Sequence, residues 1–126
     1  MDIIDFLKGK IIVSSQAMPE EPLYDEKCMT AMIKSVINGG AQALRLAGAR
    51  DIKNVKKEFD IPIIGLTKPD KLPHNWREVV YITPTLNETE ELIAAGADII
   101  AFDGTSRPRP NGCTVEDIIK LIHKAG

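Results

Sequence analysis

Apolar residues along the chain form short runs that alternate with segments of helical periodicity. Four runs predict buried strands, because they are short, rich in β-branched residues and apolar on both faces, as parallel strands are. Between them, apolar residues recur at intervals of three, four and seven, which is the pattern of one helix face. The predicted strands are residues 10–16, 41–47, 61–68 and 97–103, and the predicted helices are residues 25–38, 49–59, 87–95 and 115–124.

Residues that favour helix ends support these boundaries. Gly39 and Gly96 follow two of the predicted helices, and glycine tolerates the left-handed conformation found there. Asn87 with Glu90 three residues later predicts a capping-box-like start for the third helix. Thr114 is the expected N-cap of the last helix.

The alternation of strand and helix predicts a parallel α/β sheet. Residues 79–85 also have an extended pattern, but the preceding stretch from Lys68 is too short and too rich in proline for a crossover helix. We therefore interpret residues 79–85 as part of a loop, which leaves four βα units. Four units are half of a (β/α)₈ TIM barrel, so residues 1–126 are predicted to be a single incomplete TIM-barrel domain. A complete flavodoxin-like domain that uses residues 79–83 as a core strand is the alternative.

Length and charge narrow the classes of protein. The chain has 126 residues, whereas a complete barrel needs roughly 200 or more. It carries 16 basic and 18 acidic residues, a net charge of −2, so no nucleic-acid partner is indicated. We expect no membrane association and no signal peptide. Cys28 and Cys113 lack metal-ligand spacing, which favours free thiols in a cytoplasmic protein.

Candidate chemistry lies at the carboxyl ends of the predicted strands, where α/β folds gather their functional groups. Arg45 interrupts an apolar strand and therefore needs an anionic partner, either a ligand or a structural carboxylate. Lys68 ends the most apolar strand. Desolvation there, or closeness to Arg45, would favour the unprotonated amine that a general base requires.

Two further side chains complete the candidate site. Gln16 can donate to and accept from a sugar hydroxyl or an amide. Asp103 can pair with Lys68 or Arg45, orient a hydroxyl, or cap the turn that follows it. The basic stretch at residues 107–112 is interpreted either as an anion or docking surface or as a rigid turn.

At these residues the chain resembles the bacterial N-acetylmannosamine-6-phosphate 2-epimerases. The similar segments occur in order and span nearly the whole sequence. They are residues 12–17 with the prolines behind them, the strand that holds Arg45, residues 61–68, residues 82–85, and residues 97–110.

The resemblance implies a (β/α)₈ barrel that interconverts N-acetylmannosamine 6-phosphate and N-acetylglucosamine 6-phosphate in sialic acid catabolism. It implies that Lys68 is the catalytic residue, which removes the C2 proton and returns it to the other face. Gln16, Arg45 and Asp103 are the implied substrate-binding residues, with neither an organic cofactor nor a metal. The four further βα units of the family, which carry a carboxylate partner of the lysine and the phosphate-binding loops, have no counterpart in this sequence.

Three hypotheses therefore stand. The first is the N-terminal half of an epimerase, which binds its sugar phosphate weakly when isolated and either self-associates or pairs with a separate C-terminal half. The second is an inactive remnant that serves as a sugar-phosphate-binding or interaction module. The third is the flavodoxin-like domain.

Overall fold

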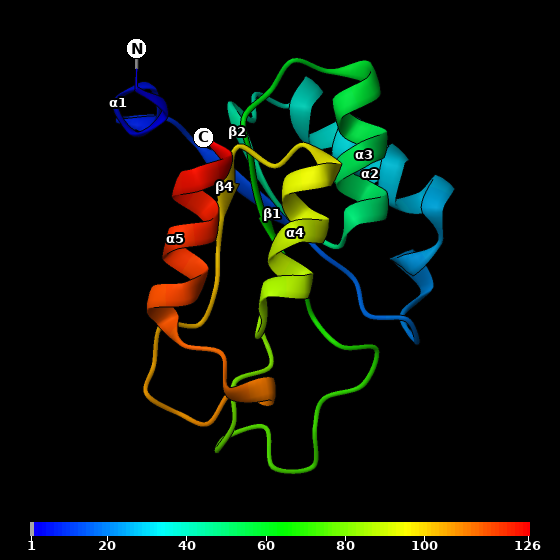
Figure 1. Cartoon of the computed structure of the whole chain (residues 1–126). Helices are drawn as coiled ribbons and strands as arrows, with labels where there is room; N and C mark the ends of the chain where they lie inside the picture. The colour runs from blue at the N-terminus through cyan, green and yellow to red at the C-terminus, as the bar shows by residue number, and fades with distance from the viewer. Residues whose placement is uncertain (1) are drawn as a thin grey trace.

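The computed structural model describes residues 2–126, which form one sheet with a helix after each strand (Figure 1). The strands are β1 (Ile12–Ser15), β2 (Ala43–Ala47), β3 (Ile63–Leu66) and β4 (Ile99–Ile100). The α-helices are α1 (Ile3–Leu7), α2 (Glu26–Asn38), α3 (Ala49–Glu58), α4 (Leu86–Ala95) and α5 (Val115–Ala125), and the 3₁₀ helices are η1 (Pro22–Tyr24) and η2 (Pro110–Gly112).

All the strands run parallel and lie in chain order, β1-β2-β3-β4. Parallel neighbours need a long crossover connection, and α2, α3 and α4 supply one between each pair of strands. The helices from α2 to α5 contact one another in the same order. This is the arrangement of half a (β/α)₈ barrel. The flavodoxin-like alternative is wrong, because that fold changes direction within the sheet and has the order 2-1-3-4-5.

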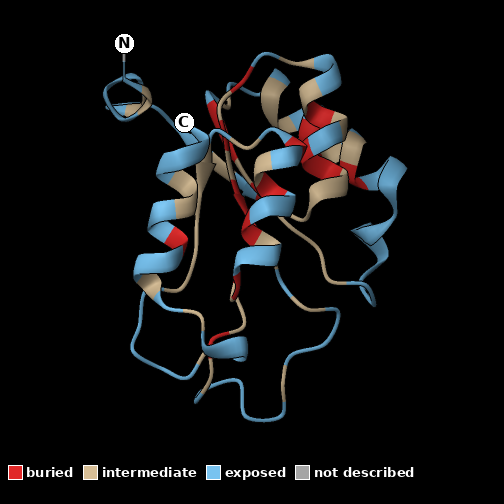
Figure 2. Ribbon diagram, viewed as in Figure 1, coloured by how far each residue is buried: buried red, intermediate tan, exposed pale blue. Residues whose placement is uncertain are grey.

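The core lies between the sheet and the inner faces of α2, α3 and α4, as the buried positions in Figure 2 show. Leu44, Leu46 and Ile63 point from the sheet into this cluster. Gly65 of β3 allows the close approach of α3 and α4, since a Cβ there would lie 2.8 Å from Ile52 Cδ1. Real Cβ atoms do not approach another carbon that closely, so glycine is required at this position.

The opposite face of the sheet has no covering helix. Side chains alternate along a strand, so the residues between the core positions face the other way. Ser14, Arg45, Ile64 and Ile99 lie in register across the four strands on this face. None of them is buried, and the neighbouring Ile12 is 41% exposed. This face corresponds to the interior of the barrel, and we call it the open face.

The long connection between β3 and α4 corrects part of the sequence interpretation. Residues 79–85 are not a strand, which confirms their assignment to a loop. The helix after them begins at Leu86 with Thr85 as N-cap, so the predicted start at Asn87 with Glu90 is wrong. Thr85 and Glu88 have the same spacing as Asn87 and Glu90, and Thr85 donates its hydroxyl hydrogen bond to Glu88. Local sequence does not distinguish the two pairs, whereas tertiary packing buries Thr85.

The ends of the remaining elements also differ from the prediction. β4 is limited to Ile99–Ile100, shorter than predicted, because pairing with β3 stops after Gly65 and Ile100. The short helix α1 was not predicted. Asp2 caps it by accepting a hydrogen bond from the backbone N–H of Ile4 at 3.1 Å. The last helix does begin after Thr114, which forms a capping box with Asp117.

One ion pair fastens the amino ends of β3 and β4. Asp98 Oδ2 accepts hydrogen bonds from Lys56 Nζ at 2.6 Å and from the backbone N–H of Ile63 at 2.9 Å. Lys56 also donates to the carbonyl of Ile61. The carboxylate thus joins α3 to the starts of two strands.

We expect Asp98→Ala to lower the free energy of unfolding by about 1–3 kcal/mol, because it leaves the partly buried Ile63 N–H and Lys56 without their acceptor. Denaturant unfolding measures this. The matched control is Lys34→Ala, which breaks an ion pair with Glu58 whose side chains are about half exposed and should cost no more than about 0.5 kcal/mol. Equal losses in the two variants would contradict the assignment.

Candidate functional site

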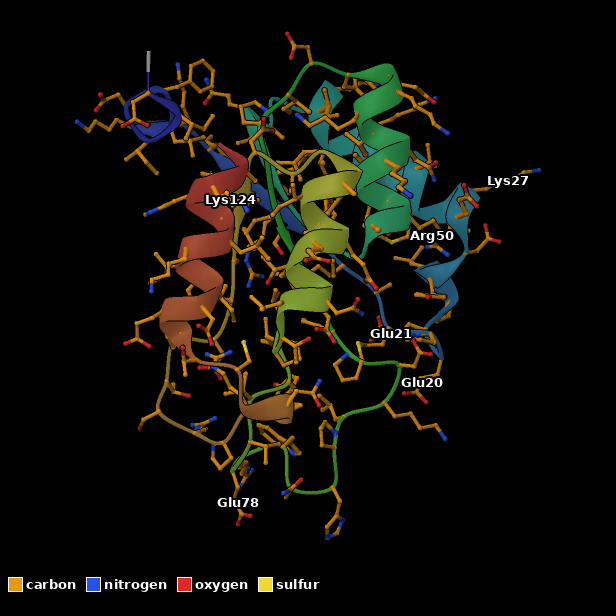
Figure 3. The ribbon with its side chains drawn as sticks, in the orientation of Figure 1. Glu20, Glu21, Lys27, Arg50, Glu78 and Lys124 are labelled. Carbon is orange, nitrogen blue, oxygen red and sulfur yellow. The ribbon has the colours of Figure 1, made fainter. Side chains whose placement is uncertain are left out.

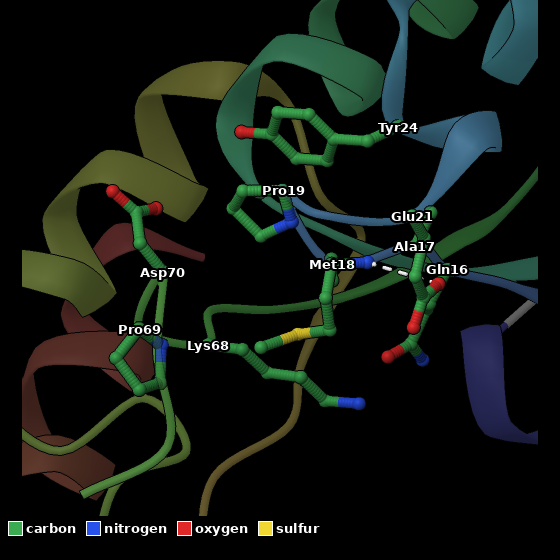
Figure 4. A pocket seen from close by; sticks show the side chains of 11 residues that line it. Gln16, Ala17, Met18, Pro19, Glu21, Tyr24, Lys68, Pro69 and Asp70 are labelled. Atoms are coloured by element: carbon green, nitrogen blue, oxygen red, sulfur yellow. Dashed lines mark hydrogen bonds between the residues drawn. The ribbon is translucent and has the colours of Figure 1, made fainter.

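The carboxyl ends of the strands meet at one end of the sheet, where the long loops gather at the bottom of Figure 1. A pocket of about 180 Å³ lies there, between the loop after β1 and the ends of β2 and β3. Figure 4 shows its lining from close by. The lining residues are Gln16, Ala17, Met18, Pro19, Glu21, Tyr24, Ala47, Gly48, Lys68, Pro69 and Asp70.

The pocket brings together Gln16 and Lys68, two of the four predicted site residues. Gln16 follows β1 directly, and Lys68 lies two residues after the end of β3. In Figure 4 the Lys68 side chain passes beside Met18 and extends toward the side of the pocket that holds Gln16. An amine and an amide from different strands therefore face one small volume.

The amide of Gln16 is only half satisfied. Its Nε2 donates to Ser14 Oγ at 2.9 Å, which fixes the orientation of the amide. Its Oε1 is enclosed and has no hydrogen-bond partner within residues 2–126. A buried acceptor without a partner is costly, so this oxygen is placed to accept a hydrogen bond from a ligand hydroxyl or N–H.

Lys68 is exposed, which differs from the desolvated environment expected from its place after an apolar strand. No carboxylate of residues 2–126 lies within 4.0 Å of its amine. A pairing with Asp103, one of the alternatives that the sequence left open, is therefore absent from the described part of the chain.

Arg45 lies at the centre of the open face, in register with Ser14 and Ile64. It is partly buried and forms no ion pair with any carboxylate between residues 2 and 126. The interpretation as a structural salt bridge is therefore wrong for these residues. Arg45 does not line the pocket of Gln16 and Lys68. It lies in register with Ser14, whose hydroxyl accepts the hydrogen bond from the Gln16 amide.

Asp103 caps a turn. Its Oδ1 accepts a hydrogen bond from the backbone N–H of Thr105 at 2.8 Å. Burial acts to raise the pKa of Asp103, but the hydrogen bonds from Thr105 and the charges of Arg107 and Arg109 outweigh it and lower the pKa below its ordinary value. Of the possibilities that the sequence left open, the structure supports the turn cap. Asp103 is not part of the pocket lining.

The stretch at residues 107–112 joins two loops. The carbonyl of Pro108 accepts from Val80 N at 3.2 Å, and Arg109 Nη1 donates to the carbonyl of Pro84 at 3.4 Å. The guanidinium of Arg109 also lies 5.9 Å from the centre of the Phe102 ring. Because Asp103 lies near both arginines, this stretch acts as a structural clamp between the loops after β3 and β4.

Sequence reasoning missed the residues that hold the wall of the pocket. Arg50 Nη2 donates to the carbonyl of Tyr24 at 2.6 Å, and its guanidinium lies 4.6 Å from the centre of the Tyr24 ring. Arg50 Nε also pairs with the buried Asp51 at 3.2 Å. Figure 3 shows Arg50 on the same side of the molecule as Glu20 and Glu21, which belong to this loop. Arg50 and Tyr24 are 26 positions apart in the sequence, and helical or strand periodicity does not reveal a contact between residues so far apart.

We expect the lowered pKa of Asp103 to contribute to the pH dependence of stability. The folded carboxylate binds its proton less tightly than the unfolded one, so the contribution is present above the ordinary value of 3.8 and is lost as the pH falls through the folded pKa. The difference in unfolding free energy between the wild type and Asp103→Asn should therefore shrink between about pH 5 and pH 3. Denaturant unfolding across this range measures it, with the exposed Asp60→Asn as control. A difference that stays constant with pH would contradict the assignment.

Comparison with known proteins identifies the family. A model of the NanE family, described as "Putative N-acetylmannosamine-6-phosphate epimerase", matches residues 29–126. The chain belongs to this family. Curated relatives named "Putative N-acetylmannosamine-6-phosphate 2-epimerase" are 40% identical over 125 residues in Clostridium perfringens (strain 13) and 42% identical over 120 residues in Enterobacter sp. (strain 638).

The chain spans about half the length of the curated relatives that it matches. It covers 54% of the Clostridium perfringens relative and 49% of the Enterobacter relative, while 98% and 95% of this chain are aligned. The solved structure of the N-acetylmannosamine-6-phosphate 2-epimerase from Clostridium perfringens matches with a TM-score of 0.88 and 38% identity, over 100% of this chain and 53% of that one. Half of a TIM barrel is therefore present here.

No helix of residues 2–126 is long and apolar enough to cross a bilayer. The same residues contain no group of three or more His, Cys, Asp or Glu side chains placed to hold a metal ion.

Proposed function

We propose that this chain supplies the N-terminal half of the active site of an N-acetylmannosamine-6-phosphate 2-epimerase. The observation that carries the proposal is the pocket in which Lys68 and the unpartnered Oε1 of Gln16 face the same volume. Family membership supports the same reaction, the interconversion of N-acetylmannosamine 6-phosphate and N-acetylglucosamine 6-phosphate in sialic acid catabolism. A cytoplasmic location remains a prediction.

The proposed chemistry is inversion at C2 of the open-chain sugar. C2 is adjacent to the C1 aldehyde, so removal of its proton moves an electron pair toward the C1 oxygen and gives an enolate. The amine of Lys68 takes this proton and becomes an ammonium, which returns a proton to the other face of C2 as the enolate electron pair moves back, and the epimer and the free amine result. A cation near the developing oxyanion stabilises it, and Arg45 is the candidate because no carboxylate of residues 2–126 neutralises it.

Gln16 and Asp103 have different parts in this proposal. Gln16 Oε1 accepts from a sugar hydroxyl or from the N–H of the acetamido group, since it is the enclosed acceptor of the pocket. Asp103 shapes the loop after β4, because its carboxylate accepts the hydrogen bond from Thr105 that closes the turn. Asp103 does not line the pocket of Gln16 and Lys68, so it contacts the substrate only if the bound sugar phosphate extends beyond this pocket.

The site is incomplete without a second half-barrel. General-base catalysis needs an unprotonated amine, which burial favours, and Lys68 is exposed. β1 and β4 each have one unpaired edge. At the start of β1, Ile11 and Ile12 are 63% and 41% exposed. We propose that four further βα units close the sheet, whether they continue this chain or belong to a separate one. The isolated chain then binds sugar phosphate weakly and turns over poorly.

One observation favours a second candidate function. The exposed amine of Lys68, with no carboxylate within 4.0 Å in residues 2–126, fits a module that binds a sugar phosphate without epimerising it. Exchange of the C2 proton distinguishes the two functions, since binding alone leaves the C–H bond intact.

The test of the enzyme proposal uses this chain combined with the remaining half of the Clostridium perfringens epimerase. We expect C2–H exchange in D₂O, followed by NMR, and we expect Lys68→Ala to reduce the exchange at least about 100-fold because general-base catalysis contributes that much. Binding of the sugar phosphate should change little. The control is Lys71→Ala, an exposed lysine three residues away that does not line the pocket. Full exchange in Lys68→Ala would exclude this lysine as the base.

We also expect the isolated chain to self-associate through the open face and the free edges, as measured by sedimentation. Ile12→Lys should weaken the association about tenfold or more, since burying one isoleucine contributes about 1.5–3 kcal/mol. Leu23→Lys is the control, because Leu23 is 48% exposed in η1 and lies away from the sheet face. A monomer at high concentration, or equal effects of the two variants, would contradict an interface at the open face.

A further inference from the structure

The sheet separates at the carboxyl ends of β3 and β4, close to Lys68. Direct pairing of the two strands stops at Gly65 and Ile100, with a last backbone hydrogen bond from Ala101 N to the carbonyl of Gly65. Beyond this point the loop segment around Thr83 lies between the two chain segments. Thr83 is completely buried there, although it belongs to a long loop.

The hydroxyl of Thr83 connects both sides of this gap. Its Oγ1 accepts a hydrogen bond from the backbone N–H of Thr67 at 3.1 Å and donates one to the carbonyl of Ala101 at 2.7 Å. The backbone N–H of Thr83 donates to the carbonyl of Thr67 at 3.2 Å. Both backbone groups of Thr67 are therefore held by Thr83, and Lys68 is the next residue.

The backbone of Thr83 is strained. Its φ is 44°, in the left-handed region, which β-branched residues rarely adopt. Glycine or asparagine would adopt this conformation at lower cost, but glycine has no hydroxyl to span the gap. Such strain persists only where the surroundings hold it, and it concentrates at functional sites.

We propose that Thr83 is a positioning residue that fixes the backbone of Thr67 and thereby directs Lys68 into the pocket shared with Gln16. This inference deepens the proposed function and rests on it in one respect, the role of Lys68 as the base. The hydrogen bonds themselves do not depend on the reaction. The competing explanation is that Thr83 only holds the loop between β3 and α4 in place and has no effect on Lys68.

The first test compares Thr83→Val with Thr83→Ser in the full chain. Valine keeps the shape and the β-branch but loses the hydroxyl, whereas serine keeps the hydroxyl. We expect the Thr67 amide to exchange with D₂O at least tenfold faster in Thr83→Val and at the wild-type rate in Thr83→Ser. The control is Thr85→Val, another buried threonine, whose hydroxyl donates to Glu88 and not to Thr67.

The second readout reports on the lysine itself. The Lys68 side-chain NMR signal and its rate of reductive methylation should change in Thr83→Val and return to wild type in Thr83→Ser, while those of Lys71 stay constant. An unchanged Thr67 amide in Thr83→Val overturns the bridge. A faster Thr67 amide with unchanged Lys68 overturns the positioning role and leaves a structural fastening. If Thr83→Val does not fold, Thr83→Ser remains decisive, because altered Lys68 reactivity despite a retained hydroxyl also overturns the proposal.

Turnover in the completed barrel separates this inference from the proposed function. There we expect Thr83→Val to lower kcat about tenfold with little change in KM, because the base is misplaced while the binding groups remain. A wild-type barrel that does not exchange the C2 proton of the sugar would contradict the epimerase proposal. The results on Thr67 amide exchange and on Lys68 reactivity in the Thr83 variants would remain valid. An unaltered kcat in Thr83→Val would overturn the positioning role.

Discussion

The packing of one face of the sheet against α2, α3 and α4 is the constraint on which the rest of the structure depends. Leu44, Leu46 and Ile63 meet the helices in a single core, and Gly65 lets α3 and α4 come close enough to fill it. Because side chains alternate along a strand, fixing this face also fixes the other one. Arg45 is therefore placed on the open face by its two leucine neighbours.

The same packing determines where chemistry can occur. Parallel strands all end at one edge, so the segments after β1 and β3 deliver Gln16 and Lys68 to one pocket from distant parts of the sequence. The face of the sheet that packs against the helices is filled by the hydrophobic core. The residues of the open face are not fully covered, and β1 and β4 each have an unpaired edge. Lys68 lies beyond the end of β3 at this edge of the sheet, and its side chain is exposed.

The loops around the pocket are held by hydrogen bonds from side chains to backbone carbonyls and amides. Arg50 reaches the carbonyl of Tyr24 and secures one wall. Arg109 and Thr83 secure the long connection after β3, through the carbonyl of Pro84 and through Thr67 and Ala101. Buried backbone groups need partners, and where the strands diverge these side chains provide them. The clamp by Arg109 and the turn capped by Asp103 show that charged residues near strand ends also serve the loops.

The sequence alone determined the alternation of strands and helices, the loop at residues 79–85, the cap at Thr114, and the family, because these follow from periodicity and from ordered local motifs. It also placed Gln16 and Lys68 among the candidate site residues, since polar residues at strand ends stand out against apolar runs, and their roles stay predictions. The tertiary structure decided that these two share a pocket whose lining does not include Arg45 or Asp103. It also decided that Thr85 caps α4 in place of Asn87, that the Thr83 hydroxyl joins Thr67 to Ala101, and that Arg50 binds the carbonyl of Tyr24. The hydrogen bonds of Thr83 and Arg50 join residues 16 to 26 positions apart, and no local sequence pattern records contacts at such separations or the burial that accompanies them.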